Sequence, residues 1–219
     1  GNDGPWDQPE NLKKYNGVLR LTSGSATNGF SITGMAYQGE WKATEHVPER
    51  AINSSEIGRY GALSPNDGGK THRYSLSGDW AKTDAQGARK LNLYVIDYGL
   101  NLFSAPSGYI SGAQGDQHEQ ADERTVWGGQ ASRSWFLGAD WKDTELTAGL
   151  QWRHDRISKV GLYTTENRLR TNAVREDRIR ETAIAAFFDV RTQWNDWLRS
   201  RIGLRRDQIS AQATALGGQ

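Results

Sequence analysis

The sequence contains no cysteine, which excludes disulfide frameworks, thiolate catalysis and cysteine-based metal sites. It has no apolar run near the roughly 20 residues that a membrane-spanning helix needs. An excess of one charge is also missing, because 27 basic residues balance 26 acidic ones, and this balance argues against a nucleic-acid partner. None of these absences excludes a membrane β-barrel, whose strands need an apolar side chain only at every second position.

Glycine and aromatic residues are plentiful, with 25 Gly, 9 Trp and 8 Tyr, whereas proline is scarce at 5. This composition fits strands joined by turns better than helical bundles. The pattern is clearest in residues 125–155, where apolar and polar residues alternate in two arms around a tight connection. Because side chains alternate between the faces of a strand, each arm has one apolar and one polar face. The apolar positions of the second arm are Leu146, Ala148, Leu150 and Trp152.

The same two-faced pattern recurs along the whole chain, and short connections alternate with long ones. Besides the two arms of 125–155, strands are expected over residues 15–23, 29–41, 71–81, 89–100, 179–192 and 197–207. Long connections are expected over residues 42–70, 101–123 and 156–177, and a further loop from 208 onward. The alternation breaks near Ile96, which indicates either a β-bulge or a strand leaving its apolar band.

Tryptophans lie beside the short connections, at Trp80, Trp135, Trp141, Trp194 and Trp197. Strands of about ten residues are long enough to cross a bilayer when tilted. Long loops on one rim, short turns on the other and interfacial aromatic residues are typical of an outer-membrane barrel. A soluble β-sandwich also alternates, but it has no reason to separate its loops by length. The sequence therefore favours an antiparallel up-and-down transmembrane β-barrel segment of about eight strands.

Several fragments resemble the barrel domain of TonB-dependent outer-membrane receptors in their order and spacing. They are GPWDQPE (4–10), NGF (28–30), RYSLSG (73–78), YGLNLF (98–103), GDQ (115–117) and WLR (197–199). The resemblance implies a larger barrel of about 22 strands in the bacterial outer membrane, filled by a plug domain. It also implies active import of a scarce nutrient, such as a ferric siderophore, driven by an inner-membrane energy-coupling complex. The plug, the energy-coupling box and the terminal strands are missing, so residues 1–219 are expected to be the middle of the barrel domain.

In such a barrel the polar side of each strand faces the lumen and the plug. The residues expected there include Arg73, Asp79, Lys90, Gln151, Asp189, Arg191, Arg199 and Arg201. Ligand capture is expected at the long-loop rim, because loops carry recognition on rigid scaffolds. The candidates are Tyr98, Asp116, Gln117, His118, Arg153, Asp155, Arg168, Arg178 and Arg180, with Arg170 and Arg175 in the same basic cluster. Clustered arginines suit a carboxylate or phosphate ligand, but they suit lipopolysaccharide phosphates or water equally well.

Other functions find less support in the sequence. The acidic residues 115–123 suggest calcium only weakly, because the spacing of an EF-hand loop is absent. The four histidines lack metal-ligand spacing, and neither a metal nor a cofactor is expected. A passive porin and a barrel-type hydrolase remain alternatives, and His154-Asp155 is the one adjacent pair that suits hydrolysis. The expected partners are outer-membrane lipid and lipopolysaccharide, the plug, the energy-coupling complex and a small nutrient, and the chain is not expected to be an enzyme.

Overall fold

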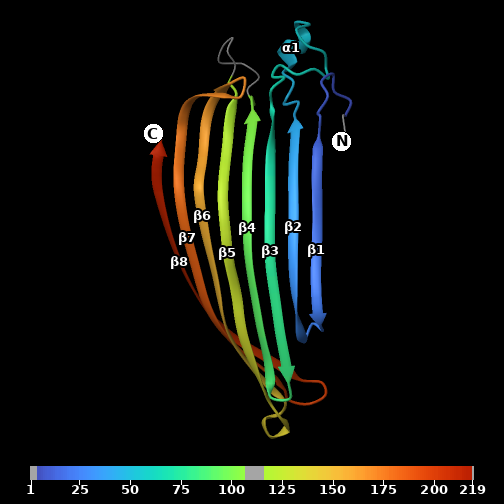
Figure 1. Ribbon diagram of the computed structural model, residues 1–219, viewed down its shortest axis with the longest axis vertical. Helices are drawn as coiled ribbons and strands as arrows, with labels where there is room; N and C mark the ends of the chain where they lie inside the picture. Colours follow the sequence, from blue (N-terminus) through green and yellow to red (C-terminus); the bar gives the residue numbers. More distant parts are fainter. Residues whose placement is uncertain (1–3, 107–115, 219) are drawn as a thin grey trace.

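The structure is a computed structural model that describes residues 4–106 and 116–218. Each strand pairs with its neighbours in the chain, and together they form one antiparallel eight-stranded sheet in the order β1 to β8 (Figure 1). The all-β, up-and-down architecture expected from the sequence is therefore confirmed. The strands are β1 (Lys13–Gly24), β2 (Asn28–Lys42), β3 (Gly68–Asp84), β4 (Gly87–Ser104), β5 (His118–Leu137), β6 (Thr144–Glu166), β7 (Leu169–Gln193) and β8 (Arg199–Gly217).

The connections separate by length onto the two ends of the sheet, as Figure 1 shows. Residues 43–67, which contain the short helix α1 (Glu49–Asn53), lie at one end, where β4 also ends and β5 begins. Residues 25–27, 85–86, 138–143 and 194–198 form the turns at the other end. We call these the long-loop end and the short-turn end. The expected tryptophans lie at the short-turn end, within its turns or in the strand segments next to them.

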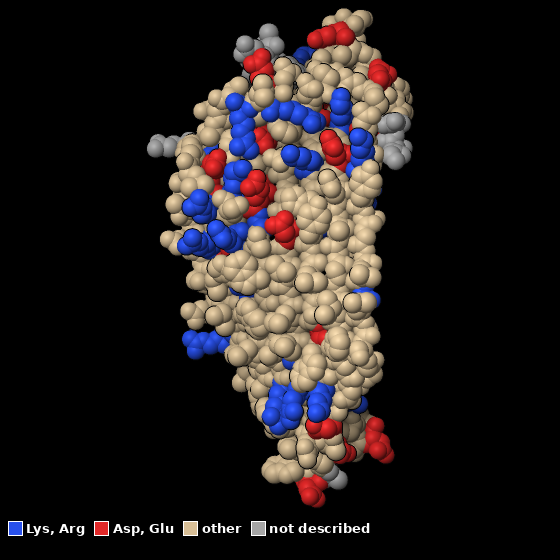
Figure 2. Space-filling model, in the orientation of Figure 1, with Lys and Arg blue, Asp and Glu red and all other residues tan. Residues whose placement is uncertain are grey.

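The two faces of the sheet differ in chemistry. One cross-strand row reads Leu21, Ile32, Gly78, Leu93, Gly129, Trp152 and Ile184. The row on the opposite face, one residue along each strand, reads Thr22, Ser31, Asp79, Asn92, Gln130, Gln151 and Ala185. We call these the apolar face and the ionic face. Figure 2 shows a central band almost free of charged side chains, with charged residues gathered toward both ends. We call this central part of the sheet the apolar band.

The apolar face is not packed against another layer of the described chain. Leu21 is 61% exposed, Ile184 is 55% exposed and Leu150 is 56% exposed. In water such a surface would cost about 25 cal/mol for each Å² left uncovered. Strand β8 keeps the pattern only as far as Leu204, because Arg206 follows on the same face. No helix among residues 4–106 and 116–218 has the length and apolarity to cross a membrane.

Three expectations about the connections were wrong. Residues 156–177 do not form a long loop, because β6 continues to Glu166 and β7 begins at Leu169. Residues 208–217 extend β8, and the connection after β4 is shorter than expected at both ends. The β6–β7 pair shifts register between Ile157 and Val160, and again nearer the turn, so its strands lose the strict alternation that identified strands elsewhere.

The break in alternation near Ile96 has the second of its two expected causes. Strand β4 pairs with β3 and with β5 without a register shift at this point. Val95 and Asp97 lie on the apolar face, so the strand leaves its apolar band between them. The bulge in this part of the sheet lies instead opposite Glu123 and Arg124, in β6.

Candidate ligand site on the ionic face

Tyrosines and arginines alternate along one row of the ionic face near the long-loop end. The register places Tyr37 of β2 opposite Arg73 of β3, Arg73 opposite Tyr98 of β4, and Tyr98 opposite Arg124 of β5. Neighbouring side chains of such a row lie about 5 Å apart at their Cβ atoms. The sequence supplied Tyr98 as a rim candidate and Arg73 as a lumen-facing residue, and the structure joins them in one surface, the tyrosine–arginine row.

Two cations lie over the aromatic rings of this row. The Arg124 guanidinium lies 5.9 Å from the centre of the Tyr98 ring, and Lys14 Nζ lies 5.7 Å from that of Tyr37. Arg124 is also fixed by an ion pair with Asp122. Arg73 differs, because it is exposed and makes no ion pair within the described residues. The row therefore holds one fixed and one uncompensated guanidinium beside two phenols.

A second arginine is locked next to this row. Arg153 donates from Nε to Asp155 Oδ1 at 2.6 Å and from Nη2 to Asp155 Oδ2 at 2.7 Å. Asp155 is only 6% exposed. A bidentate pair of this kind fixes the guanidinium in direction as well as in position. The sequence named both residues as rim candidates, and the structure places both on the ionic face.

This chemistry suits an anionic ligand. Guanidinium groups donate two parallel hydrogen bonds to a carboxylate or phosphate, and phenols either donate or accept. The residues that the sequence missed here are Lys14, Tyr37 and Arg124. Each is unremarkable in its own strand. The cross-strand register places Arg124 opposite Tyr98 and Tyr37 opposite Arg73, and Lys14 lies against the Tyr37 ring.

The expected lumen residues nearer the short-turn end also lie on the ionic face, and most are paired with one another. Arg201 donates to Asp189 at 2.7 Å, and Asp79 accepts a hydrogen bond from Asn92 at 2.8 Å. Gln151 donates to Gln130 at 2.6 Å. Arg191 pairs with Glu145 at 3.4 Å, and Arg199 donates to Gln193 at 2.7 Å. Lys90, Gln151, Asp189, Arg191 and Arg201 line a shared hollow on this face.

Three segments that are distant in the sequence are tied together at the long-loop end by buried polar groups, which we call the loop latch. Asp67 is fully buried and accepts hydrogen bonds from Ser64 Oγ at 2.7 Å, Gln117 Nε2 at 2.7 Å and Ala105 N at 3.0 Å. Gln117 Oε1 accepts from Thr165 Oγ1 and from Arg168 N, each at 3.0 Å. The latch joins the β2–β3 connection, both ends of the β4–β5 connection and the β6–β7 turn.

The rim candidates Gln117 and Arg168 therefore belong to the latch. Arg168 also donates to the backbone oxygens of Asn66 at 2.6 Å and Asp67 at 3.2 Å. Asp116 and His118 are half-buried on either side of Gln117. A ligand role for these four residues stays a prediction, and the contacts of Gln117 and Arg168 give these two a structural role as well.

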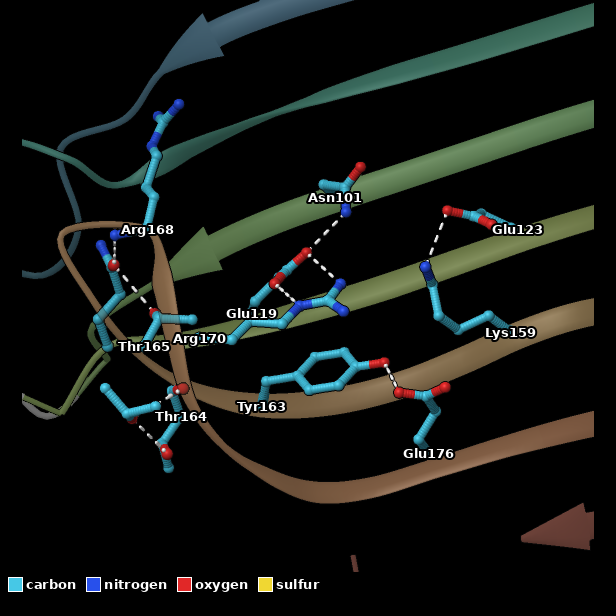
Figure 3. A network of polar contacts seen from close by, with 12 residues as sticks. Asn101, Glu119, Glu123, Lys159, Tyr163, Thr164, Thr165, Arg168, Arg170 and Glu176 are labelled. Carbon is cyan, nitrogen blue, oxygen red and sulfur yellow. Dashed lines mark hydrogen bonds and ion pairs between the residues drawn. The ribbon is translucent and has the colours of Figure 1, made fainter. Parts of the chain in front are cut away.

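The remaining members of the expected basic cluster are distributed over both faces. Arg175 pairs with Asp177 at 2.5 Å on the ionic face, and Arg178 and Arg180 lie exposed on the apolar face. Arg170 donates to Glu119 Oε2 at 2.6 Å, and Asn101 donates to Glu119 Oε1 at 2.6 Å (Figure 3). The cluster is thus not one site, because neighbouring positions of a strand point to opposite faces.

Glu119, Arg170 and Tyr163 form a network beyond the apolar band (Figure 3). Burial alone would raise the pKa of Glu119, but hydrogen bonds from Arg170 and Asn101 outweigh it and hold that pKa below its usual value. The same hydrogen bond raises the pKa of Arg170. Burial, together with donation to Glu176 at 2.6 Å, raises the pKa of Tyr163 to about 12.

Calcium is only weakly expected at residues 115–123, and three acidic side chains in this segment have basic partners. Glu119 pairs with Arg170, Asp122 with Arg124, and Glu123 with Lys159. Within the described ranges, no group of three His, Cys, Asp or Glu residues is placed to hold a metal ion. Gly115 lies outside the described residues.

His154 and Asp155 do not form a catalytic pair. His154 lies on the apolar face, where its ring is 4.5 Å from that of Trp127 and its Nδ1 is 2.7 Å from Thr182 Oγ1. Asp155 points to the ionic face, where it accepts both hydrogen bonds of Arg153. The sheet separates the two side chains, so Asp155 cannot orient His154 as a base.

Neither a protein-family model nor a curated protein sequence matches this chain. Among solved structures, the unliganded ferric citrate transporter FecA is similar, with a TM-score of 0.71 over 93% of this chain. The sequences are 14% identical, so this likeness concerns the fold alone. The chain spans 30% of the length of that transporter.

Proposed function

We propose that this chain forms part of the wall of a bacterial outer-membrane transporter, which captures a scarce anionic nutrient at the tyrosine–arginine row and imports it. The observation that carries the proposal is the single sheet with one exposed apolar face and one ionic face. Lipid is the solvent in which an exposed apolar face is stable, and an aqueous lumen is the one in which an ionic face is stable. The fold likeness to a ferric citrate transporter supports the same conclusion.

The eight strands of the described chain do not close into a barrel on themselves. Within the described residues, β1 and β8 each pair on one side only. An open sheet edge is not stable in the hydrocarbon layer, because its backbone groups would lack hydrogen bonds. We infer that residues 1–219 belong to the barrel domain of a longer chain, of about 22 strands as in plugged outer-membrane transporters.

In this proposal the two halves of the ionic face have different roles. The tyrosine–arginine row, at the long-loop end, meets the ligand first. The paired residues nearer the short turns, such as Asp189 and Arg201, face a plug domain of the same chain. Movement of that plug, driven by an inner-membrane energy-coupling complex of the TonB type, would release the ligand inward. Ferric citrate or another carboxylate-rich iron chelate is the ligand class that suits Arg73 and Tyr98 best.

The test uses the full-length protein and ferric citrate as the first probe. Arg73→Ala is expected to weaken binding about 10- to 100-fold, because it removes a charged hydrogen-bond donor worth about 1.5–3 kcal/mol. Lys90→Ala is the matched control, since it removes a cation of the same face near the short turns. Equal affinity of both variants and the unchanged protein, across carboxylate chelates, would remove the row from ligand binding.

Uptake measurements separate active transport from a passive porin. Accumulation of the chelate that stops when the inner-membrane potential is collapsed supports energy-coupled import. A porin would instead pass ions through a planar bilayer without energy, and cations lining its lumen would give it an anion preference. Steady conductance of the full-length protein, without accumulation, would overturn the transporter proposal in favour of a porin.

A further inference from the structure

Three arginines without acidic partners lie together on the apolar face. Arg156 of β6 is directly opposite Arg180 of β7, and Arg178 is the next residue of β7 on the same face. All three are exposed, and none forms an ion pair with any residue of the described ranges. Like charges directly opposite each other destabilise a sheet. We call this group the arginine patch.

The patch borders the apolar band. On β6, Trp152 and His154 precede Arg156 on this face, and on β7 Ile184 and Thr182 follow Arg180. His154 packs against Trp127 with ring centres 4.5 Å apart, so aromatic side chains mark the border. Positions on one face of a strand are about 6.6 Å apart, which places the patch just beyond that border. In membrane proteins, tryptophan and tyrosine are enriched at the level of the lipid headgroups.

On β6 and β7, the cations of this face that lie farther from the band are neutralised. Lys159 is 3.1 Å from Glu123, and Arg170 is 2.6 Å from Glu119, on the same face and nearer the β6–β7 turn. Figure 2 shows the basic and acidic side chains mixed in this upper region. On β6 and β7, the outward-facing charges without protein partners therefore lie at headgroup depth, where a membrane would supply the counter-charge.

We propose that the arginine patch binds the phosphate groups of lipopolysaccharide in the outer leaflet. The proposal rests on the proposed function for the presence of a membrane and for the orientation with the long loops outside. Guanidinium forks match phosphate oxygens bidentately, and three of them fixed on two paired strands fit a headgroup with several phosphates. The binding would also relieve the repulsion between Arg156 and Arg180.

The sheet provides a matched control at its opposite end. Lys82, Arg89 and Arg133 form a row on the apolar face near the short turns, with Lys82 opposite Arg89 and Arg89 opposite Arg133. These three are exposed as well. In the proposed orientation they meet the inner leaflet, which holds no lipopolysaccharide. The two triplets therefore carry equal charge on the same face but meet different lipids.

The experiment compares R156Q/R178Q/R180Q with K82Q/R89Q/R133Q in the full-length protein. Lipopolysaccharide that co-purifies from outer membranes is quantified for all three proteins, because the two triplets meet different leaflets only in the membrane. Purified lipopolysaccharide is then titrated into the unchanged protein and the patch variant after reconstitution into vesicles, where it is added from the long-loop side. The first variant is expected to bind on the order of 100-fold more weakly, or roughly fivefold for each arginine, and the control to bind as the unchanged protein does. Lipopolysaccharide stripped of phosphate is expected to bind the unchanged protein as weakly as intact lipopolysaccharide binds the first variant.

Two results would overturn the proposal: unchanged affinity of the patch variant, or equal losses in both triple variants. If the triple variant assembles poorly, R180Q alone decides by the presence or absence of a roughly fivefold loss. Nutrient binding and uptake by the patch variant are expected to equal those of the unchanged protein, because the patch lies on the face opposite the tyrosine–arginine row. A transport failure of the unchanged protein would thus sink the proposed function without bearing on lipopolysaccharide binding.

Discussion

The two halves of the β6–β7 hairpin differ in the regularity of their strand pairing and in the distribution of polar side chains between the two faces. From Thr144 to Ile157, β6 pairs with β7 residue by residue, and the apolar side chains of β6 from Leu146 to Trp152 keep to one face. From Val160 to Glu166, the same two strands shift register repeatedly, and polar side chains occupy both faces. Most of the first half lies within the apolar band, whereas the second half extends beyond it toward the latch.

The difference indicates what each solvent demands. Lipid accepts only apolar side chains on the outward face, so a one-residue slip would turn polar side chains toward it. Water accepts either kind, and there bulges and side-chain hydrogen bonds fix the strands instead. The alternation of apolar and polar residues is thus a property of the segment within the apolar band rather than of the strand as a whole.

The largest expected effect comes from placing the same charge in each half. Leu150→Lys puts a cation on the apolar face within the band, where Leu150 is 56% exposed. It is expected to destabilise the folded barrel by about 2–4 kcal/mol, the range for Lys near the bilayer midplane. Leu169→Lys, at an equally apolar and 73% exposed position beside the β6–β7 turn, is the matched control.

Denaturant unfolding of the full-length protein in lipid vesicles measures both changes. The control is expected to shift the free energy of unfolding by no more than about 0.5 kcal/mol, as is usual for surface positions. Equal effects of the two substitutions would contradict the membrane assignment, because water would then cover both leucines.

A smaller effect is expected from breaking the loop latch. Asp67→Ala removes the acceptor of Ser64, Gln117 and Ala105 and leaves buried donors unsatisfied, at about 1–3 kcal/mol. The loss is local, so hydrogen exchange is expected to speed up in residues 43–67 and in the β6–β7 turn but not in the strands along the band. Glu56→Ala, at an exposed position of the same connection, is the control. Uniformly faster exchange across the sheet would show that the latch holds more than the loops.

The comparison also explains how far the sequence alone could lead. Alternation predicted the strands, their order and the short turns along the apolar band, as at Leu146 to Trp152. It failed for residues 156–177, because Ile157, Val160 and Tyr163 are separated by bulges that no local pattern announces. The sequence also supplied Arg73, Tyr98 and Arg153 as separate candidates. It did not predict the tyrosine–arginine row, because a row is defined by register between strands, whereas the pattern reports only position within one strand.

Acid is expected to loosen the hairpin beyond the band before it affects the band. The pKa of Glu119 is held below its usual value, so the carboxylate stabilises the folded state above that usual value and ceases to do so as pH falls through the lowered pKa. The protection of amides near Arg170 from hydrogen exchange, corrected for the intrinsic pH dependence of exchange, is therefore expected to fall as the pH drops below about 4.5. Glu119→Gln is expected to cost about 1 kcal/mol at neutral pH and to flatten this dependence. An unchanged acid response in that variant would assign it to another group.

The smallest expected effect concerns Tyr163, which lies in the same half of the hairpin. Its phenol donates to Glu176, and burial together with that carboxylate raises the pKa of Tyr163 to about 12. A raised pKa means that the contact stabilises the fold fully below the usual value of 10.0 and is lost as pH rises through about 12. Tyr163→Phe is expected to cost about 0.5 kcal/mol, the lower end of the range for a hydrogen bond, because only one hydrogen bond is removed and the ring stays in place. In an absorbance titration Glu176→Gln should ionise Tyr163 at lower pH, though still above the usual value, because burial persists. If instead Tyr163 ionised at its usual pKa in the unchanged protein, the part of the hairpin beyond the band would be open to water. Side-chain hydrogen bonds would then not order that part, and backbone pairing alone would hold it.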